Sequence, residues 1–169
     1  FLISCSEKIF FLEFMATLYL TPPLCNILIS LVNAAGLRKL KILLINIPLI
    51  IYWIILFILT TLPGQMAVTL DVSDKIEHFG AYGLLSVFLY LNLSFQNRFK
   101  IFKKFPGTFT VVIASFYGLI DELHQLLVPG RSADVLDWLA DFSGSLVAVL
   151  ITGYLIKRFK EIEIGKNKL

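Results

Sequence analysis

Charged residues are scarce in this chain, at 16% of its 169 residues, whereas a typical soluble domain has about 25%. This scarcity excludes a disordered chain and a nucleic-acid binder with a basic face, and it argues against a soluble enzyme. Cysteine is also rare, and Cys5 and Cys25 form neither a disulfide framework nor a metal-binding spacing. The sequence has no H-E-x-x-H zinc motif, no serine nucleophile elbow, no P-loop and no dinucleotide fingerprint. No common catalytic motif therefore assigns a chemistry to it.

Apolar residues dominate instead, at 57% of the chain, with a mean hydropathy of +0.82. The first uncharged run has 21 residues, which is enough for about 30 Å of helix. Two later runs are shorter and cross a bilayer only if their helices include an acidic turn at one end. We therefore predict an all-α integral membrane protein folded as a four-helix bundle. Its spans are expected around the uncharged runs 42–62, 79–97, 105–120 and 142–156.

Lysine and arginine predict the orientation of these spans. Three cations precede the first span, four lie between the second and third, and five follow the fourth. The other two loops, 63–78 and 126–138, have Lys75 and Arg131 as their only lysine or arginine residues. By the positive-inside rule, both ends of the four-span core over 37–156 are expected in the cytoplasm. A basic cytoplasmic tail over 157–169 follows this core.

Residues 1–36 depart from this pattern. They are apolar but are interrupted by Glu13 and by Pro22 and Pro23, and the chain begins with Phe1. They resemble neither a signal peptide nor a clean span. We expect an apolar N-terminal extension, which is either a re-entrant or interfacial segment or a misassigned start.

The predicted topology gathers the unusual polar residues at the outer ends of the helices. One polar stripe consists of Asp74, His78 and Tyr82, at positions i, i+4 and i+8 of a helix. Another runs from Asp134 through Asp137, Asp141 and Ser145. Each stripe can turn inward to a shared cluster that binds a ligand. The candidate binding residues are Asp74, Lys75, His78, Tyr82, Asp121, Glu122, Gln125, Arg131, Asp134 and Asp137.

Plainer structural roles compete with ligand binding. Asp74 and Asp134 fit N-caps of the second and fourth helices. A network of ion pairs that only ties the helix ends together is also open, with Lys75 and Arg131 as the natural partners of the acids that end the third helix. Helix packing, rather than ligand contact, is the expected role of Gly80, Gly83, Gly118 and Gly144.

Three of these residues are candidate catalytic groups: Glu122, His78 and Asp121. A pair between His78 and either of the two acids could transfer a proton or form half of a metal site. No sequence motif indicates a cofactor. A divalent metal held by the side chains of His78, Asp121, Glu122 and Asp137 is nevertheless conceivable.

The polar motifs closely resemble those of the VanZ-like family of small bacterial membrane proteins. The pattern D-K-x-x-H-x-x-x-Y begins at Asp74, and D-E-x-x-Q-x-x-x-P-G-R-S-x-D-x-x-D begins at Asp121. The resemblance covers about 37–156, including the order of the helices. Family members often have Asn where this chain has Asp141, and Gly where it has Ala148. The family's recurrent positions correspond to Asp74, Lys75, His78, Tyr82, Asp121, Glu122, Gln125, Pro129, Arg131, Asp134, Asp137 and Gly144.

The resemblance implies a multi-pass protein of the bacterial cytoplasmic membrane with a role in the cell envelope. The family takes its name from a protein associated with resistance to the glycopeptide antibiotic teicoplanin. The expected partners are the lipid bilayer and an envelope lipid or glycopeptide, with no nucleic acid, and a second copy of the chain in the case of a transporter. Such membership transfers fold and site better than phenotype.

Three functions are compatible with these features. The first is binding of a lipid head group, an envelope precursor or the antibiotic, with Lys75 and Arg131 holding a phosphate or carboxylate and the acids accepting hydrogen bonds from a sugar or amine. The second is a membrane-embedded hydrolase or transferase, with Glu122 or His78 as general base and Asp121 orienting it. The third is a small transporter formed by an oligomer.

Overall fold

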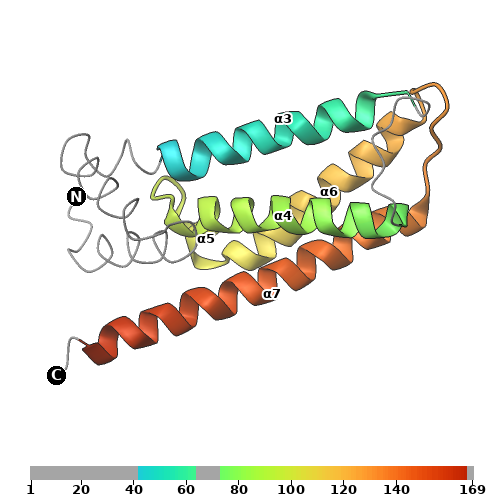
Figure 1. Cartoon of the computed structure of the whole chain (residues 1–169). Helices are drawn as coiled ribbons and strands as arrows, with labels where there is room; N and C mark the ends of the chain where they lie inside the picture. The colour runs from blue at the N-terminus through green and yellow to red at the C-terminus, as the bar shows by residue number, and fades with distance from the viewer. Residues whose placement is uncertain (1–41, 64–72, 167–169) are drawn as a thin grey trace, which may run out of the picture. The chain divides into compact units, whose positions relative to one another are not determined.

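A computed structural model describes residues 42–63 and 73–166 of the chain, and every regular element in these two segments is helical (Figure 1). This confirms the predicted all-α fold. The expected extension over 1–36 lies outside the described residues. The elements are a π-helical turn η1 (Ile42–Asn46), α3 (Ile47–Thr61), α4 (Asp74–Phe95), a short α5 (Lys100–Lys104), α6 (Pro106–Gln125) and α7 (Val135–Lys166).

Three helical segments of the described chain are long and apolar enough to cross a membrane: Leu43–Thr61, Asp74–Phe95 and Val135–Ile162. The protein is therefore a multi-pass membrane protein. The third predicted span, α6, is not among the three segments. Its 20 residues include glycine, threonine and serine, and two carboxylates lie near its end, so its mean hydropathy is lower than that of the others.

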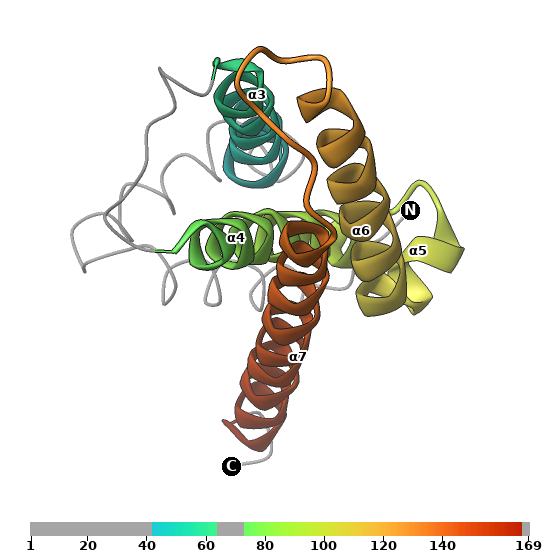
Figure 2. The same cartoon turned by 90° about the vertical axis from the view of Figure 1, so that its right-hand side faces the viewer.

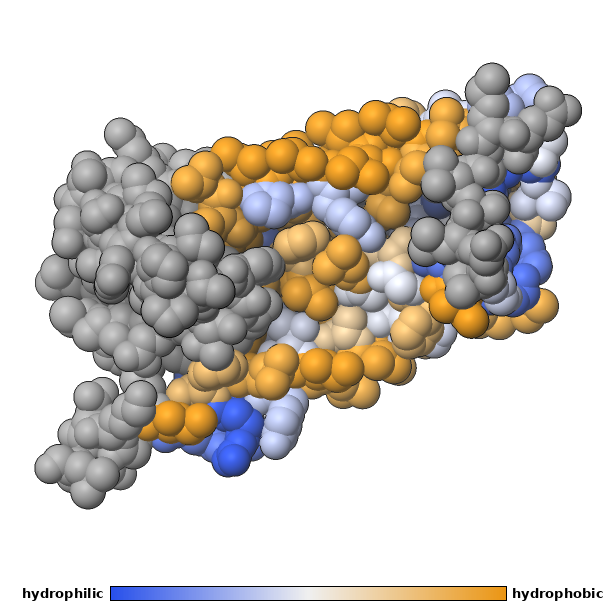
Figure 3. All heavy atoms as spheres, viewed as in Figure 1, coloured by the Kyte–Doolittle hydropathy of each residue, from blue (hydrophilic) through white to orange (hydrophobic). Residues whose placement is uncertain are grey.

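The first span illustrates how the sequence produces its helix. Pro48 lies in the first turn of α3, directly after a helical turn, and its ring has no N–H to donate to the carbonyls of that turn. The π-helical turn η1 precedes it. Large apolar side chains such as Ile50, Ile54 and Phe57 are more than half exposed on the protein alone, as expected for residues that face lipid. Figure 3 shows hydrophobic side chains along α3 and α7, whereas hydrophilic ones gather where α4 and α7 begin.

Residues 45–152 form one compact unit, and α4 lies at its centre (Figure 2). Leu49 and Leu56 of α3 pack against Leu85 and Leu89 of α4, and all four are buried. Aromatic side chains of α6 complete this core. Tyr52 also links α3 to α4 by donating its hydroxyl to the carbonyl of Ala81, at 2.9 Å.

Three glycines lie where α4, α6 and α7 approach one another, and at two of them, Gly118 and Gly144, a side chain would collide with its neighbours. A Cβ on Gly144 would overlap the carbonyl of Phe79 on α4, and a Cβ on Gly83 would lie 3.5 Å from the carbonyl oxygen of Gly144. A Cβ on Gly118 would lie 2.7 Å from Oδ2 of Asp141. These contacts confirm the predicted packing role for Gly83, Gly118 and Gly144, whereas a Cβ on Gly80 would meet nothing within 4 Å.

The end of α3, the start of α4, the end of α6 and the start of α7 meet at one end of this unit (Figure 1). The loop between α6 and α7 turns at Gly130, whose φ of 76° lies in the left-handed region that favours glycine. The predicted gathering of the polar motifs at one end is therefore confirmed.

Candidate functional site

Ten polar residues lie on the helix turns at this end, and we call them the polar end cluster. They come from the first turns of α4, the last turns of α6 and the first turns of α7 together with the residue before it. The members are Asp74, Lys75, His78, Tyr82, Asp121, Glu122, Gln125, Asp134, Asp137 and Asp141. Nine of them are predicted binding residues, and Asp141 is the addition.

Lys75 joins α4 to the start of α7. Its Nζ lies 2.9 Å from Oδ2 of Asp134 and 3.0 Å from Oδ1 of Asp137. Lys75 and Asp134 are each 42% exposed, whereas Asp137 is buried. The pKa of Asp134 is lowered because its carboxylate accepts the backbone N–H of Leu136 and the ammonium of Lys75. These three residues form a half-open, charged layer.

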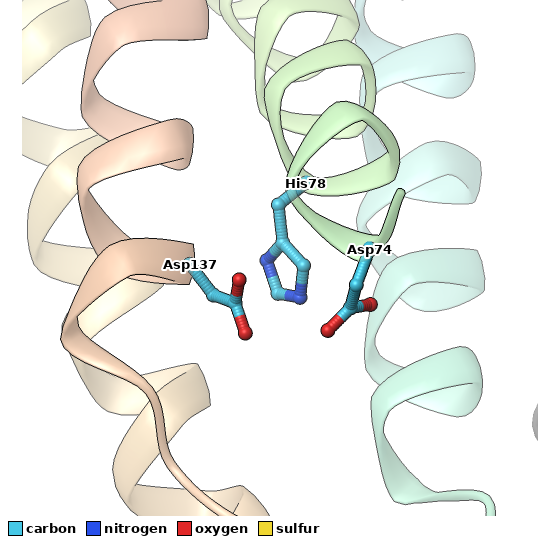
Figure 4. Close-up of side chains that lie close together, drawn as sticks. All are labelled: Asp74, His78 and Asp137. Atoms are coloured by element: carbon cyan, nitrogen blue, oxygen red, sulfur yellow. The ribbon is translucent and has the colours of Figure 1, made fainter. Parts of the chain in front are cut away.

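His78 lies deeper in the cluster and contacts Asp141. Its Nδ1 lies 3.0 Å from Oδ1 of Asp141, a side chain that is fully buried. Figure 4 shows the imidazole of His78 between the carboxylates of Asp74 and Asp137. Three carboxylates, those of Asp74, Asp137 and Asp141, thus lie close to one histidine ring.

The innermost part of the cluster comes mostly from α6. Tyr82 donates its hydroxyl to Oδ2 of Asp121 at 3.2 Å, and both residues are buried. Oε2 of Glu122 accepts the backbone N–H of Asp134 at 2.8 Å. The other carboxylate oxygen of Glu122, Oε1, and Oδ2 of Asp141 are buried, and neither has a hydrogen-bond partner in the described part of the protein. Buried carboxylate oxygens without partners are costly.

The ion-pair partners predicted for Lys75 and Arg131, namely the two acids Asp121 and Glu122 near the end of α6, are wrong. Lys75 pairs with the acids of α7 rather than with Asp121 or Glu122. Arg131 contacts the end of α3, where its Nε and Nη2 donate to the carbonyls of Leu62 and Leu59, both at 3.4 Å. Because the last carbonyls of a helix have no partner within that helix, a nearby guanidinium satisfies them. Arg131 is therefore placed outside the polar end cluster.

The two predicted N-caps differ. The helix α4 begins at Asp74 itself, so Ser73 occupies the cap position, and it makes no side-chain cap bond. Asp134 does cap α7, because its Oδ1 accepts the N–H of Leu136 at 2.8 Å. The side chain of Glu122, on α6, accepts the backbone N–H of this capping residue, Asp134. In a capping box, that N–H is accepted instead by a Glu or Gln side chain three residues further along the same helix.

His78 hydrogen-bonds Asp141, not either of the acids predicted for it, Asp121 and Glu122. Among the described residues, candidate metal-binding atoms lie within 4.8 Å of one another in two groups that share His78. One group adds Asp74 and Asp137, and the other adds Glu122 and Asp141. The predicted metal set is therefore divided, and Asp121 belongs to neither group. Asp141 lies on the polar stripe that begins at Asp134. That stripe was the sequence signal from which Asp141 could have been predicted as a member of the site.

The fold and this site define a class: an all-helical, multi-pass membrane protein with an acid-rich polar cluster where its helices end. Comparison with known families is more specific. The sequence model of the VanZ/LLP1 family matches residues 39–157. The chain belongs to this family, as its sequence motifs predict. No curated protein and no solved structure matches the chain.

Proposed function

We propose that this VanZ/LLP1 protein binds a component of the cell envelope at the polar end cluster. The component would be a lipid head group, an envelope precursor or a glycopeptide antibiotic. The observation that carries the proposal is the excess of acids over cations in the cluster. Six carboxylates face a single lysine and a single histidine, namely Asp74, Asp121, Glu122, Asp134, Asp137 and Asp141 against Lys75 and His78.

The charges favour a ligand that offers hydrogen-bond donors. Lys75 already binds two carboxylates, and Arg131 binds the end of α3. Neither cation is thus free to hold a phosphate by itself. Carboxylates accept hydrogen bonds from amines and hydroxyls, so an amine-bearing or sugar-bearing head group fits the site best.

The exposed residues of the cluster are the ones a head group would reach first. Asp74 is exposed, and Lys75 and Asp134 are each 42% exposed. They lie at or just before the first turns of α4 and α7, beside apolar helix surfaces. A ligand could therefore keep its lipid tail against the helices while its head group contacts these three side chains.

We further propose that the core over 37–156 crosses the cytoplasmic membrane four times, with both ends in the cytoplasm. The positive-inside rule supports this orientation, because the cations of the core avoid the end that holds the cluster, apart from Lys75 and Arg131. In this arrangement α6 is the third span, and its acidic end contacts α4 and α7 rather than lipid. The cluster then faces outward, where envelope components are found.

Native mass spectrometry of the full chain tests the binding proposal. The probes are phosphatidylethanolamine, phosphatidylglycerol and teicoplanin, each added to the detergent-purified protein. Phosphatidylethanolamine, teicoplanin or both should be retained over phosphatidylglycerol. The double variant Asp74→Asn with Asp134→Asn should weaken retention by about a hundred-fold or more, since each hydrogen bond to a charged group contributes roughly 1.5–3 kcal/mol and two are lost.

A matched control is Glu161→Gln, which removes an exposed carboxylate paired with Arg158 near the far end of α7. This variant should bind like the wild type. The proposal fails if the wild type retains none of the three probes, or if the double variant and the control bind equally.

A second candidate function is supported by the bond between His78 and Asp141. A carboxylate that orients an imidazole is the arrangement of a general base, so a hydrolase or transferase acting on an envelope lipid is the alternative. Asp141, rather than Asp121, would then orient the base. A chemically altered lipid recovered from the wild type, but not from His78→Gln present at equal abundance, would favour this alternative.

A further inference from the structure

We infer that His78, Glu122 and Asp141 bind one divalent transition-metal ion. This buried metal site is distinct from the exposed residues proposed to contact a head group, and it requires no lipid. The three residues come from α4, α6 and α7, so the ion would join the three helices that form the cluster.

The positions of the donor atoms fit a single ion. One donor atom from each residue lies within 4.8 Å of the other two, and Nδ1 of His78 lies 3.0 Å from Oδ1 of Asp141. Zinc binds imidazole nitrogen and carboxylate oxygen at about 2.0–2.2 Å, which places neighbouring ligand atoms roughly 3–4 Å apart.

The unpartnered oxygens point to a missing ligand. Oε1 of Glu122 and Oδ2 of Asp141 are buried without a hydrogen-bond partner in the described segments, on side chains that belong to residues 5% and 0% exposed. A polar oxygen in such surroundings costs free energy unless a donor or cation satisfies it. The bond from the N–H of Asp134 to Oε2 of Glu122 holds that carboxylate in place, as outer-shell contacts do at metal sites.

Charge balance also favours a dication. When ionised, Glu122 and Asp141 together carry two negative charges, and the nearby lysine is already bound to Asp134 and Asp137. An ion of charge +2 neutralises the two buried carboxylates while His78 stays neutral and acts as a ligand. An imidazole among the ligands favours zinc over calcium and magnesium, which typically have all-oxygen sites, and the two carboxylates also suit manganese.

The other group of potential ligands around His78 is a weaker site. Asp74 is exposed, and Oδ1 of Asp137 is already bound to Lys75. Neither carboxylate thus has a buried oxygen that lacks a partner. The metal is therefore expected on the side of His78 that faces Glu122 and Asp141.

Metal analysis of the full-length protein tests this inference. The purified protein is stripped with a chelator, reloaded with Zn²⁺ or Mn²⁺ alone, dialysed, and measured by inductively coupled plasma mass spectrometry. About one ion per chain is expected for the wild type. Glu122→Gln and Asp141→Asn should each lower the affinity at least ten-fold. The metal should raise the Tm of the wild type and leave that of both variants unchanged.

Two isosteric variants act as controls. Asp74→Asn removes the exposed carboxylate beside His78, and Asp121→Asn removes a buried carboxylate of α6 that belongs to neither group. Both should keep the ion. If Asp74→Asn loses it as fully as Asp141→Asn does, the ion lies in the other group and the inference is wrong.

X-ray absorption at the zinc edge gives a readout that needs no variant to fold. The wild type should show nitrogen and oxygen ligands with a histidine signature. The inference is overturned if the reloaded wild type holds no stoichiometric ion, or if Glu122→Gln and Asp141→Asn retain it. Head-group binding is measured separately with metal-free protein, so either proposal can fail without the other.

Discussion

At the scale of single residues, Asp141 connects most of the site. Its Oδ1 contacts His78, and its Oδ2 lies against Gly118, at a point where a Cβ would come within 2.7 Å. A glycine on α6 thus makes room for a carboxylate on α7. The resemblance to the VanZ-like family gives Asn as a common residue at this position, and an asparagine amide could also hydrogen-bond His78. The carboxylate adds a charge that an amide cannot provide.

Gly144 provides the sharpest prediction at this scale. The variant Gly144→Ala should destabilise the protein by about 1–3 kcal/mol, because its Cβ would overlap the carbonyl of Phe79 and push α7 away from α4. Thermal unfolding in detergent measures the effect. Gly80→Ala is the matched control, because nothing lies within 4 Å of its Cβ. Equal Tm values for the two variants would contradict the close helix crossing.

At the scale of elements, the loop between α6 and α7 stabilises α3, a helix that the loop does not connect. Arg131 reaches the carbonyls of Leu59 and Leu62 at the end of α3. These carbonyls carry the negative end of the helix dipole. A motif residue predicted to bind a ligand or the acids of α6 therefore acts as a C-terminal cap for the first span.

The variant Arg131→Ala should loosen the last turn of α3. Losing a cation at a helix C-terminus costs about 0.3–1 kcal/mol, so amide hydrogen exchange in that turn should become roughly two- to five-fold faster. Exchange in the middle of α4 should not change. Arg158→Ala serves as control, because Arg158 pairs with Glu161 on the exposed surface of α7. If the two variants exchange alike at the end of α3, the capping role is wrong.

At the scale of the whole molecule, the number of crossings determines which face the cluster occupies. Three segments of the described chain meet the length and composition of a span, and α6 does not. A helix with two carboxylates near its end can still cross if neighbouring helices cover them. The contacts of Asp121 with Tyr82 and of Glu122 with Asp134 provide such cover.

Cysteine labelling of the expressed protein tests the four-span arrangement. In a background with Cys5→Ser and Cys25→Ser, single cysteines are introduced as Asn97→Cys between α4 and α5 and as Ser132→Cys between α6 and α7. A membrane-impermeant maleimide should label position 132 in intact cells and position 97 only after permeabilisation. Labelling of both positions under the same condition would show that α6 does not cross.

Much of the fold followed from local patterns in the sequence. Uncharged runs predict membrane helices because a buried backbone must satisfy its own hydrogen bonds. Polar stripes at helical spacing placed most of the cluster at one end, and the structure brings nine of the ten predicted binding residues together there. The lower hydropathy of α6 was harder to recognise from its uncharged run, because a run without charges can still contain many small polar residues.

The sequence alone therefore determined the helical class, the family and all but one of the residues from which the site is built; the exception is Asp141, which the structure added. Only the tertiary structure decided the pairs within that set: Lys75 with Asp134 and Asp137, His78 with Asp141, and Arg131 with α3. The physical reason is that a pair across two helices depends on their rotation and distance. Those are set by contacts such as Gly144 against Phe79, which no spacing within one helix encodes.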